Sequence, residues 1–102
     1  MSRLEQIQQM LVLDPDDVFL QFSLAMEYVK LGRHEDALLQ FTRVNQMDAD
    51  YVPAYFQQAH TLVALQRSDE ARQVLQQGIE AATRVGDTHA ASQMSQMLNL
   101  LG

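Results

Sequence analysis

The feature that most constrains this chain is its similarity to itself at a distance of 34 residues. Shifting the sequence by 34 positions brings identical residues together: Asp14 with Asp48, Asp16 with Asp50, Val18 with Val52, Phe22 with Phe56, Ala25 with Ala59, Val29 with Val63, Leu31 with Leu65, Arg33 with Arg67 and Ala37 with Ala71. Unrelated segments of this length would share about two or three identities. We therefore expect two copies of one structural unit, each of which buries its apolar face against its neighbours.

Proline, glycine and acidic residues divide the chain into six segments, and within each segment apolar residues recur at helical spacing. Pro15 and Pro53 lie next to acidic residues that favour helix starts, while Gly32 and Gly86 follow apparent last turns. The pattern predicts helices over 2–13, from the break at 14–16 to 31, and over 34–47, 51–65, 68–84 and 88–101. No strand is expected, so the predicted fold class is all-α.

The repeated segment resembles the tetratricopeptide repeat family, whose unit is a helix–turn–helix of about 34 residues. The first copy matches the family's L-G-x-x-Y and A-x-x-x-F signature, with alanine in the glycine place, at Leu24, Ala25, Tyr28, Ala37 and Phe41. The second copy keeps part of the signature at Tyr55, Ala59, Ala71 and Leu75. Gln21, Gln58 and Leu62 depart from it, in the tryptophan, leucine and tyrosine places respectively.

The resemblance implies a right-handed α-solenoid of antiparallel helix pairs within a single domain, residues 1–102. Its expected parts are an N-terminal helix, 1–13, similar to the second helix of a half-unit, two repeat units, 14–47 and 48–84, and a C-terminal capping helix, 86–102. Small residues at paired positions let such helices approach to about 8–10 Å. The outer helices have one apolar stripe each, so we expect a small stand-alone protein of the bacterial type.

Composition excludes several other functions. Seven basic against thirteen acidic residues give a net charge of −6, and the basic residues are spread along the chain, so neither nucleic acid nor an anionic membrane is an expected partner. No segment approaches the roughly 20 apolar residues that a membrane span needs, and the first residues do not resemble a signal peptide. The expected location is the cytoplasm.

The second predicted helix is apolar nearly all round, and this suggests a binding surface. Leu20, Leu24, Tyr28 and Leu31 form one stripe expected to face the partner helix, and a second stripe remains to be covered. In the family, the first helix of each pair lines a concave groove. The resemblance therefore implies a peptide-binding groove lined by Phe22, Met26, Val29, Phe56, His60 and Val63.

Such a groove favours an apolar or amphipathic segment of a partner protein, because the methionine can adapt to imperfect shapes. The predicted function is thus that of an adaptor or scaffold. Two other interpretations stay open. The six residues can simply pack between adjacent helices, or a second copy of the chain can close the groove, which would make the protein a structural homodimer.

The sequence offers no site for catalysis, a cofactor or a metal ion. It lacks cysteine, a glycine-rich phosphate loop, a G-x-S-x-G motif and an EF-hand pattern. His34, His60 and His89 lie far apart, and the acidic residues cluster where helix caps are needed. We expect a protein that is not an enzyme.

Overall fold

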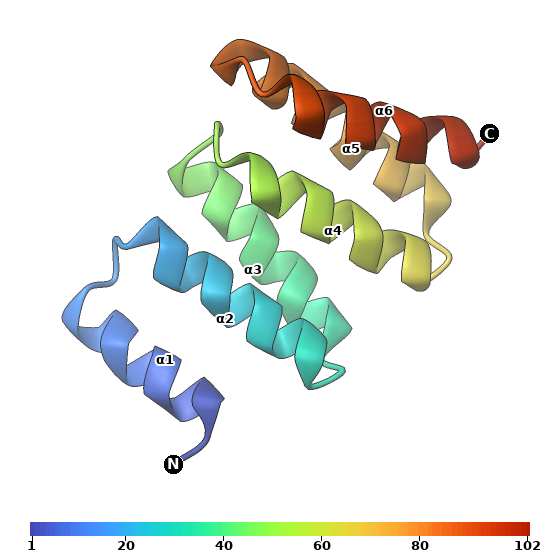
Figure 1. The fold of residues 1–102 in the computed structure, drawn as a ribbon. Helices are drawn as coiled ribbons and strands as arrows, with labels where there is room; N and C mark the ends of the chain where they lie inside the picture. Colours follow the sequence, from blue (N-terminus) through green and yellow to red (C-terminus); the bar gives the residue numbers. More distant parts are fainter.

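Six α-helices form all the regular secondary structure of the computed structural model, which describes residues 1–102 (Figure 1). They are α1 (Arg3–Leu13), α2 (Val18–Lys30), α3 (His34–Met47), α4 (Val52–Ala64), α5 (Ser68–Val85) and α6 (Thr88–Leu100). The predicted all-α class with six helices is confirmed. None of the six is both long and apolar enough to span a bilayer.

Short polar side chains fix three of the helix starts. The Ser2 hydroxyl accepts a hydrogen bond from the Glu5 amide at 3.1 Å, and the Glu5 carboxylate accepts one from the Ser2 amide, which completes a capping box on α1. Carboxylates of Asp17 and Asp87 accept bonds from the third amides of α2 and α6. These acids satisfy backbone donors that the helices leave free.

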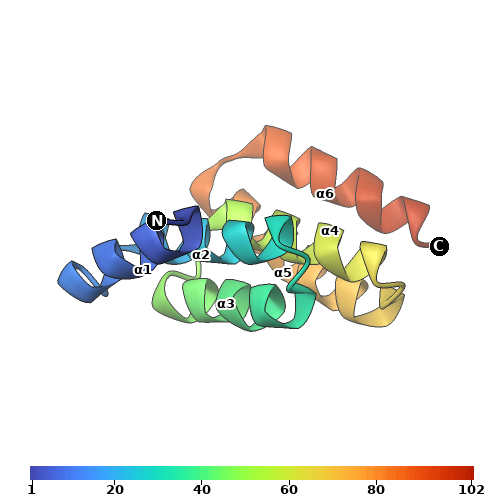
Figure 2. The same ribbon diagram turned by 90° about the horizontal axis from the view of Figure 1, so that it is seen from below.

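The helices pack in chain order, each against the next, so the molecule is a short solenoid rather than a bundle with one centre. Figure 2 shows α2 and α4 in one layer and α3 and α5 in another. In the same view α6 stands out from the layer of α2 and α4. The molecule is elongated, with principal extents of 42 × 29 × 18 Å.

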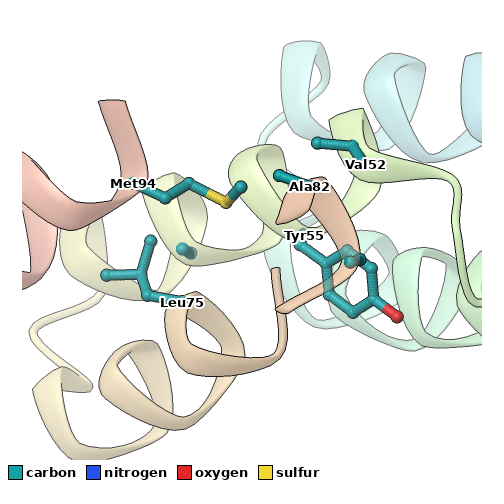
Figure 3. Packing of buried hydrophobic residues seen from close by; sticks show 7 residues of the cluster. Val52, Tyr55, Leu75, Ala82 and Met94 are labelled. Carbon is teal, nitrogen blue, oxygen red and sulfur yellow. The ribbon is translucent and has the colours of Figure 1, made fainter. Parts of the chain in front are cut away.

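Small residues lie where paired helices touch. Ala25 and Ala37 in the pair α2–α3, and Ala59 and Ala71 in the pair α4–α5, are all fully buried. Larger side chains fill the space between pairs, and Figure 3 shows one such group around the contact of α4, α5 and α6. Its labelled members are Val52, Tyr55, Leu75, Ala82 and Met94.

The face of α2 that meets α3 differs in part from the prediction. Leu24 is buried as expected, but its buried neighbours are Gln21 and Ala25, and Leu31 is exposed. Leu31 lies at the C-cap of α2, one residue beyond the last turn, where the chain leaves the contact with α3. The stripe of contact therefore shifts by one position along the helix surface.

Candidate functional site

The three predicted groove residues of the first unit lie half-buried along α2. Phe22 packs against Phe41 of α3, with ring centroids 5.9 Å apart, and against Tyr51 before α4, at 5.3 Å. Met26 and Val29 border the same apolar core. Phe22 thus has a structural role, but it is not sealed inside the molecule.

The three predicted residues of the second unit are more varied in their surroundings. Phe56 is half-buried against the core that α4 shares with α5 and α6. It also borders a small cleft of about 230 Å³ between the first turns of α4 and α6, beside Asp87 and His89. His60 and Val63 are exposed, and Val63 keeps 36% of its surface accessible.

The structure does not gather all six residues in one cleft. Phe22 and Met26 line a cleft of about 360 Å³ between α1 and α2, and Phe56 lines the separate cleft beside α6. Val29, His60 and Val63 line neither of them. What the six share is a repeat position on α2 and α4, the two helices that form one layer (Figure 2).

The sequence prediction of the site does not include two apolar residues of the α1–α2 cleft. Phe19 lines this cleft with 65% of its surface exposed, and Ile7 contributes from α1. Phe19 belongs to the apolar stripe of α2 by spacing, but its repeat equivalent is Pro53. Selecting residues by equivalence between the two units therefore missed it.

The most voluminous cleft, about 430 Å³, lies on the opposite side of the molecule, between α3 and α5. Its walls are mostly polar, with amide side chains from Asn45, Gln46 and Gln77. At its floor Gln58 donates a hydrogen bond to the Thr42 hydroxyl at 2.9 Å. This cleft lies between α3 and α5, which are the second helices of the pairs α2–α3 and α4–α5. Its polar lining does not suit an apolar ligand.

Tyr51 is an ionisable side chain that contacts Phe22. Burial, together with the nearby carboxylates of Asp17 and Asp48, raises the pKa of Tyr51. No three histidine or acidic side chains lie close enough together to hold a metal ion.

Comparison with known proteins agrees with this geometry. A family model described as tetratricopeptide repeat matches residues 28–96. No curated protein sequence matches the chain. Among solved structures, a tetratricopeptide repeat domain protein from Salinibacter ruber is 31% identical, with a TM-score of 0.81 over 86% of this chain and 89% of that one.

Two more distant structures share the fold and were solved as complexes. The TPR2B domain of yeast Sti1 in its pHsp70 complex is 18% identical, with a TM-score of 0.87 over 96% of this chain and 78% of that one. PcrH in complex with the chaperone binding region of PopD is 21% identical, with a TM-score of 0.87 over 96% and 74%. At these identities the likeness concerns the fold.

Proposed function

The chain belongs to the tetratricopeptide repeat family, and from this premise we propose that it is a protein-interaction module whose α2–α4 face binds an apolar or amphipathic segment of a partner protein. The observation that carries the proposal is the row of accessible apolar side chains on the layer of first helices. On α2 these side chains are Phe22, Met26 and Val29. The equivalent positions of α4 hold Phe56, His60 and Val63, of which only His60 is polar.

Partial burial of the two phenylalanines supports the proposal. A ring held in place by Phe41 and Tyr51 loses little conformational entropy when a ligand covers its free side. Rigid aromatic anchors of this kind dominate many interfaces. The solved complexes of yeast Sti1 and PcrH are consistent with such a role, because the same fold holds another polypeptide in both.

The same burial decides how the groove should be tested. Replacing Phe22 or Phe56 by aspartate would place a charge in a half-buried site and destabilise the fold. His60 and Val63 are exposed, so His60→Glu with Val63→Glu changes the surface while the core stays intact. Leu39→Glu is a matched control, because Leu39 is 73% exposed on α3 in the other layer.

Affinity capture from the source organism's lysate should then separate the variants. We expect the wild type and Leu39→Glu to retain the same partner and the groove variant to lose it, with equal helicity of all three by circular dichroism. Recovery of an unchanged partner by the groove variant would contradict binding at this face.

The alternative is a homodimer in which a second copy closes the groove. The large exposed fraction of Phe19 favours some form of cover on this side. Sedimentation distinguishes the two functions, since a dimer that dissociates on His60→Glu with Val63→Glu supports closure of the groove. A wild type that is a monomer at micromolar concentration excludes it.

A further inference from the structure

Most of the positive charge in this acidic protein is already neutralised by ion pairs. Of the seven basic residues, Arg33, Arg67, Arg72 and Arg84 contact carboxylates. Three have no acidic partner: Arg3, Lys30 and Arg43. Two of these three, Arg3 and Lys30, line the same apolar cleft between α1 and α2.

The cleft between α1 and α2 and the turn that joins these helices form one edge of the molecule, which we call the α1–α2 edge. The residues along it have a clear order. α1 and α2 are antiparallel (Figure 1), so the start of α1 and the end of α2 lie together and place Arg3 beside Lys30. Met26 and Phe19 follow along α2 towards the α1–α2 turn. Glu27 also lines the cleft, but the two cations outnumber it.

The far end of the edge is apolar and acidic. Leu13, in the last turn of α1, is 88% exposed, which is unusual for a side chain of this size. Asp14 and Asp16 follow it in the turn, are exposed, and make no side-chain hydrogen bond or ion pair. The edge therefore runs from a basic end through an apolar middle to an acidic end.

The α1–α2 edge is a poor fit for another helix that would pack on α1 in the way that α2 packs on α3. The repeat equivalents of position 3 are Ala37 and Ala71, whose small size allows the close approach within each pair. In α1 this position holds Arg3. The edge needs a partner that offers negative charge to Arg3 and apolar side chains to the cleft.

A second copy of the chain offers both. We propose that the protein forms a dimer through the α1–α2 edges of two copies, related by a two-fold axis that makes the two edges antiparallel. The acidic turn at Asp14 and Asp16 of each copy then meets Arg3 and Lys30 of the other. Because a two-fold interface repeats every contact, each favourable pairing occurs twice.

This dimer differs from one that closes the groove. It covers Phe19, Leu13 and the cleft lined by Phe22 and Met26, which is the α2 part of the proposed binding face next to α1. It leaves Phe56, His60, Val63 and the cleft at α6 open to another protein. In such a dimer a partner segment would contact the α4 part of the binding face. The dimer can form whether or not that segment binds, and the charge variants do not alter His60 or Val63, so the two proposals are tested separately.

Charge exchange tests the arrangement directly. In one variant Arg3→Glu with Lys30→Glu makes the basic end acidic, and in the other Asp14→Lys with Asp16→Lys makes the acidic end basic. Each variant alone pairs like charges at both contacts and should be a monomer. In a mixture of the two, both contacts again pair opposite charges, so a heterodimer should form.

Sedimentation velocity at micromolar concentration and low salt gives the readout. We expect twice the chain mass of 11.6 kDa for the wild type, for the Arg43→Glu control, for His60→Glu with Val63→Glu, and for the mixture. The two charge variants change the net charge in opposite directions, so general repulsion cannot produce a monomer in both. A monomeric wild type, a dimer that persists in either charge variant, or a mixture that stays monomeric overturns the proposal.

Discussion

At the scale of single residues, the two units use different amino acids for the same backbone geometry. Gly32 after α2 has φ of 76°, and its repeat equivalent Gln66 after α4 has φ of 61°. The amide that follows each donates to an equivalent carbonyl, Arg33 to Tyr28 at 2.8 Å and Arg67 to Leu62 at 2.9 Å. The second unit therefore keeps the left-handed helix end without glycine, at a cost in strain.

Gln66→Gly should stabilise the protein by about 0.5–1 kcal/mol. Glycine removes the steric penalty of the left-handed conformation, and its greater freedom in the unfolded chain offsets only part of this gain. Urea unfolding measures the change. The reverse substitution, Gly32→Gln, should destabilise by a similar amount, and a loss of stability on Gln66→Gly would show that the turn is not strained.

Gly78→Ala should destabilise the protein by about 1–3 kcal/mol, because it overpacks the contact of three helices. A Cβ atom there would lie 2.7 Å from Cβ of Tyr55 and 2.6 Å from the sulfur of Met94. The methionine can move aside, but the tyrosine Cβ is fixed by the α4 backbone. Gln76→Ala, at an exposed position of α5, is the control and should change stability by less than about 0.5 kcal/mol. Equal effects would contradict the close packing at Gly78.

A departure from the repeat signature proves to have a structural equivalent. The Gln21 amide donates to the Pro15 carbonyl at 2.8 Å, and the Tyr55 hydroxyl donates to the Ala49 carbonyl at 2.7 Å. Both side chains thus tie their helix to the preceding turn at the same repeat position. Sequence comparison alone marks Gln21 as an exception, because a shared hydrogen-bond acceptor is visible only in three dimensions.

At the scale of helices, Arg67 links the two repeat units. It donates two hydrogen bonds of 2.8 Å to Glu70 in its own unit and one to Glu35 at the start of α3. The hydrogen bonds and positive charge of Arg67 lower the pKa of Glu70. Folding therefore favours the ionised form of Glu70, and this contribution to stability is present at neutral pH.

Glu70→Gln should lower stability at pH 7 but not in acid. A carboxyl with a lowered pKa contributes fully above its unfolded-state value, about 4.3, and the contribution disappears as pH falls through the folded-state value. The free energy of unfolding, measured in urea at neutral pH and near pH 3, should show this convergence with the wild type. In an Arg67→Gln background the same change should have little effect. A difference that persists unchanged in acid would exclude this ion pair as its cause.

The sequence predicts helix boundaries better than helix faces. All six helices start and end within one or two residues of the predicted positions, because caps, proline and glycine act locally. The apolar pattern wrongly predicts Leu31 on the face of α2 that meets α3, and repeat equivalence does not select Phe19 for the site. Those features depend on how neighbouring helices cross, which the residue pattern of one helix does not determine.

At the scale of the whole molecule, stability depends on contacts between successive helices. The buried side chain of α6 is Met94, which is fully covered and packs with Tyr55 and Leu75 against α4 and α5 (Figure 3). In a linear array of this kind each element contacts mainly its neighbours, so the last helix depends on few anchors.

Met94→Ala should cost about 2–5 kcal/mol, because it leaves a cavity among three helices. Met97→Ala, at a partly exposed position on the same helix, should cost clearly less. Thermal and urea unfolding of both variants measure the two costs. Equal small effects would show that α6 contributes little to the shared core.

The candidate site was only partly predictable for the same reason. Repeat equivalence selects Phe22 with Phe56 and Met26 with His60, but clefts form where α1 and α6 meet the repeats. α1 and α6 lie outside the two repeat units that were compared with each other. The sequence therefore indicates a row of positions, whereas the accessible hollows depend on the ends of the solenoid.

The most direct test of the proposed binding face is chemical-shift mapping of the ¹⁵N-labelled protein during titration with the captured partner segment. The account predicts that the amide signals that move are those of α4 and the end of α2 around Val29, His60 and Val63, while those of the outer surfaces of α3 and α5 stay in place. Shifts confined to α3 and α5, around the polar cleft at Gln77, would contradict it.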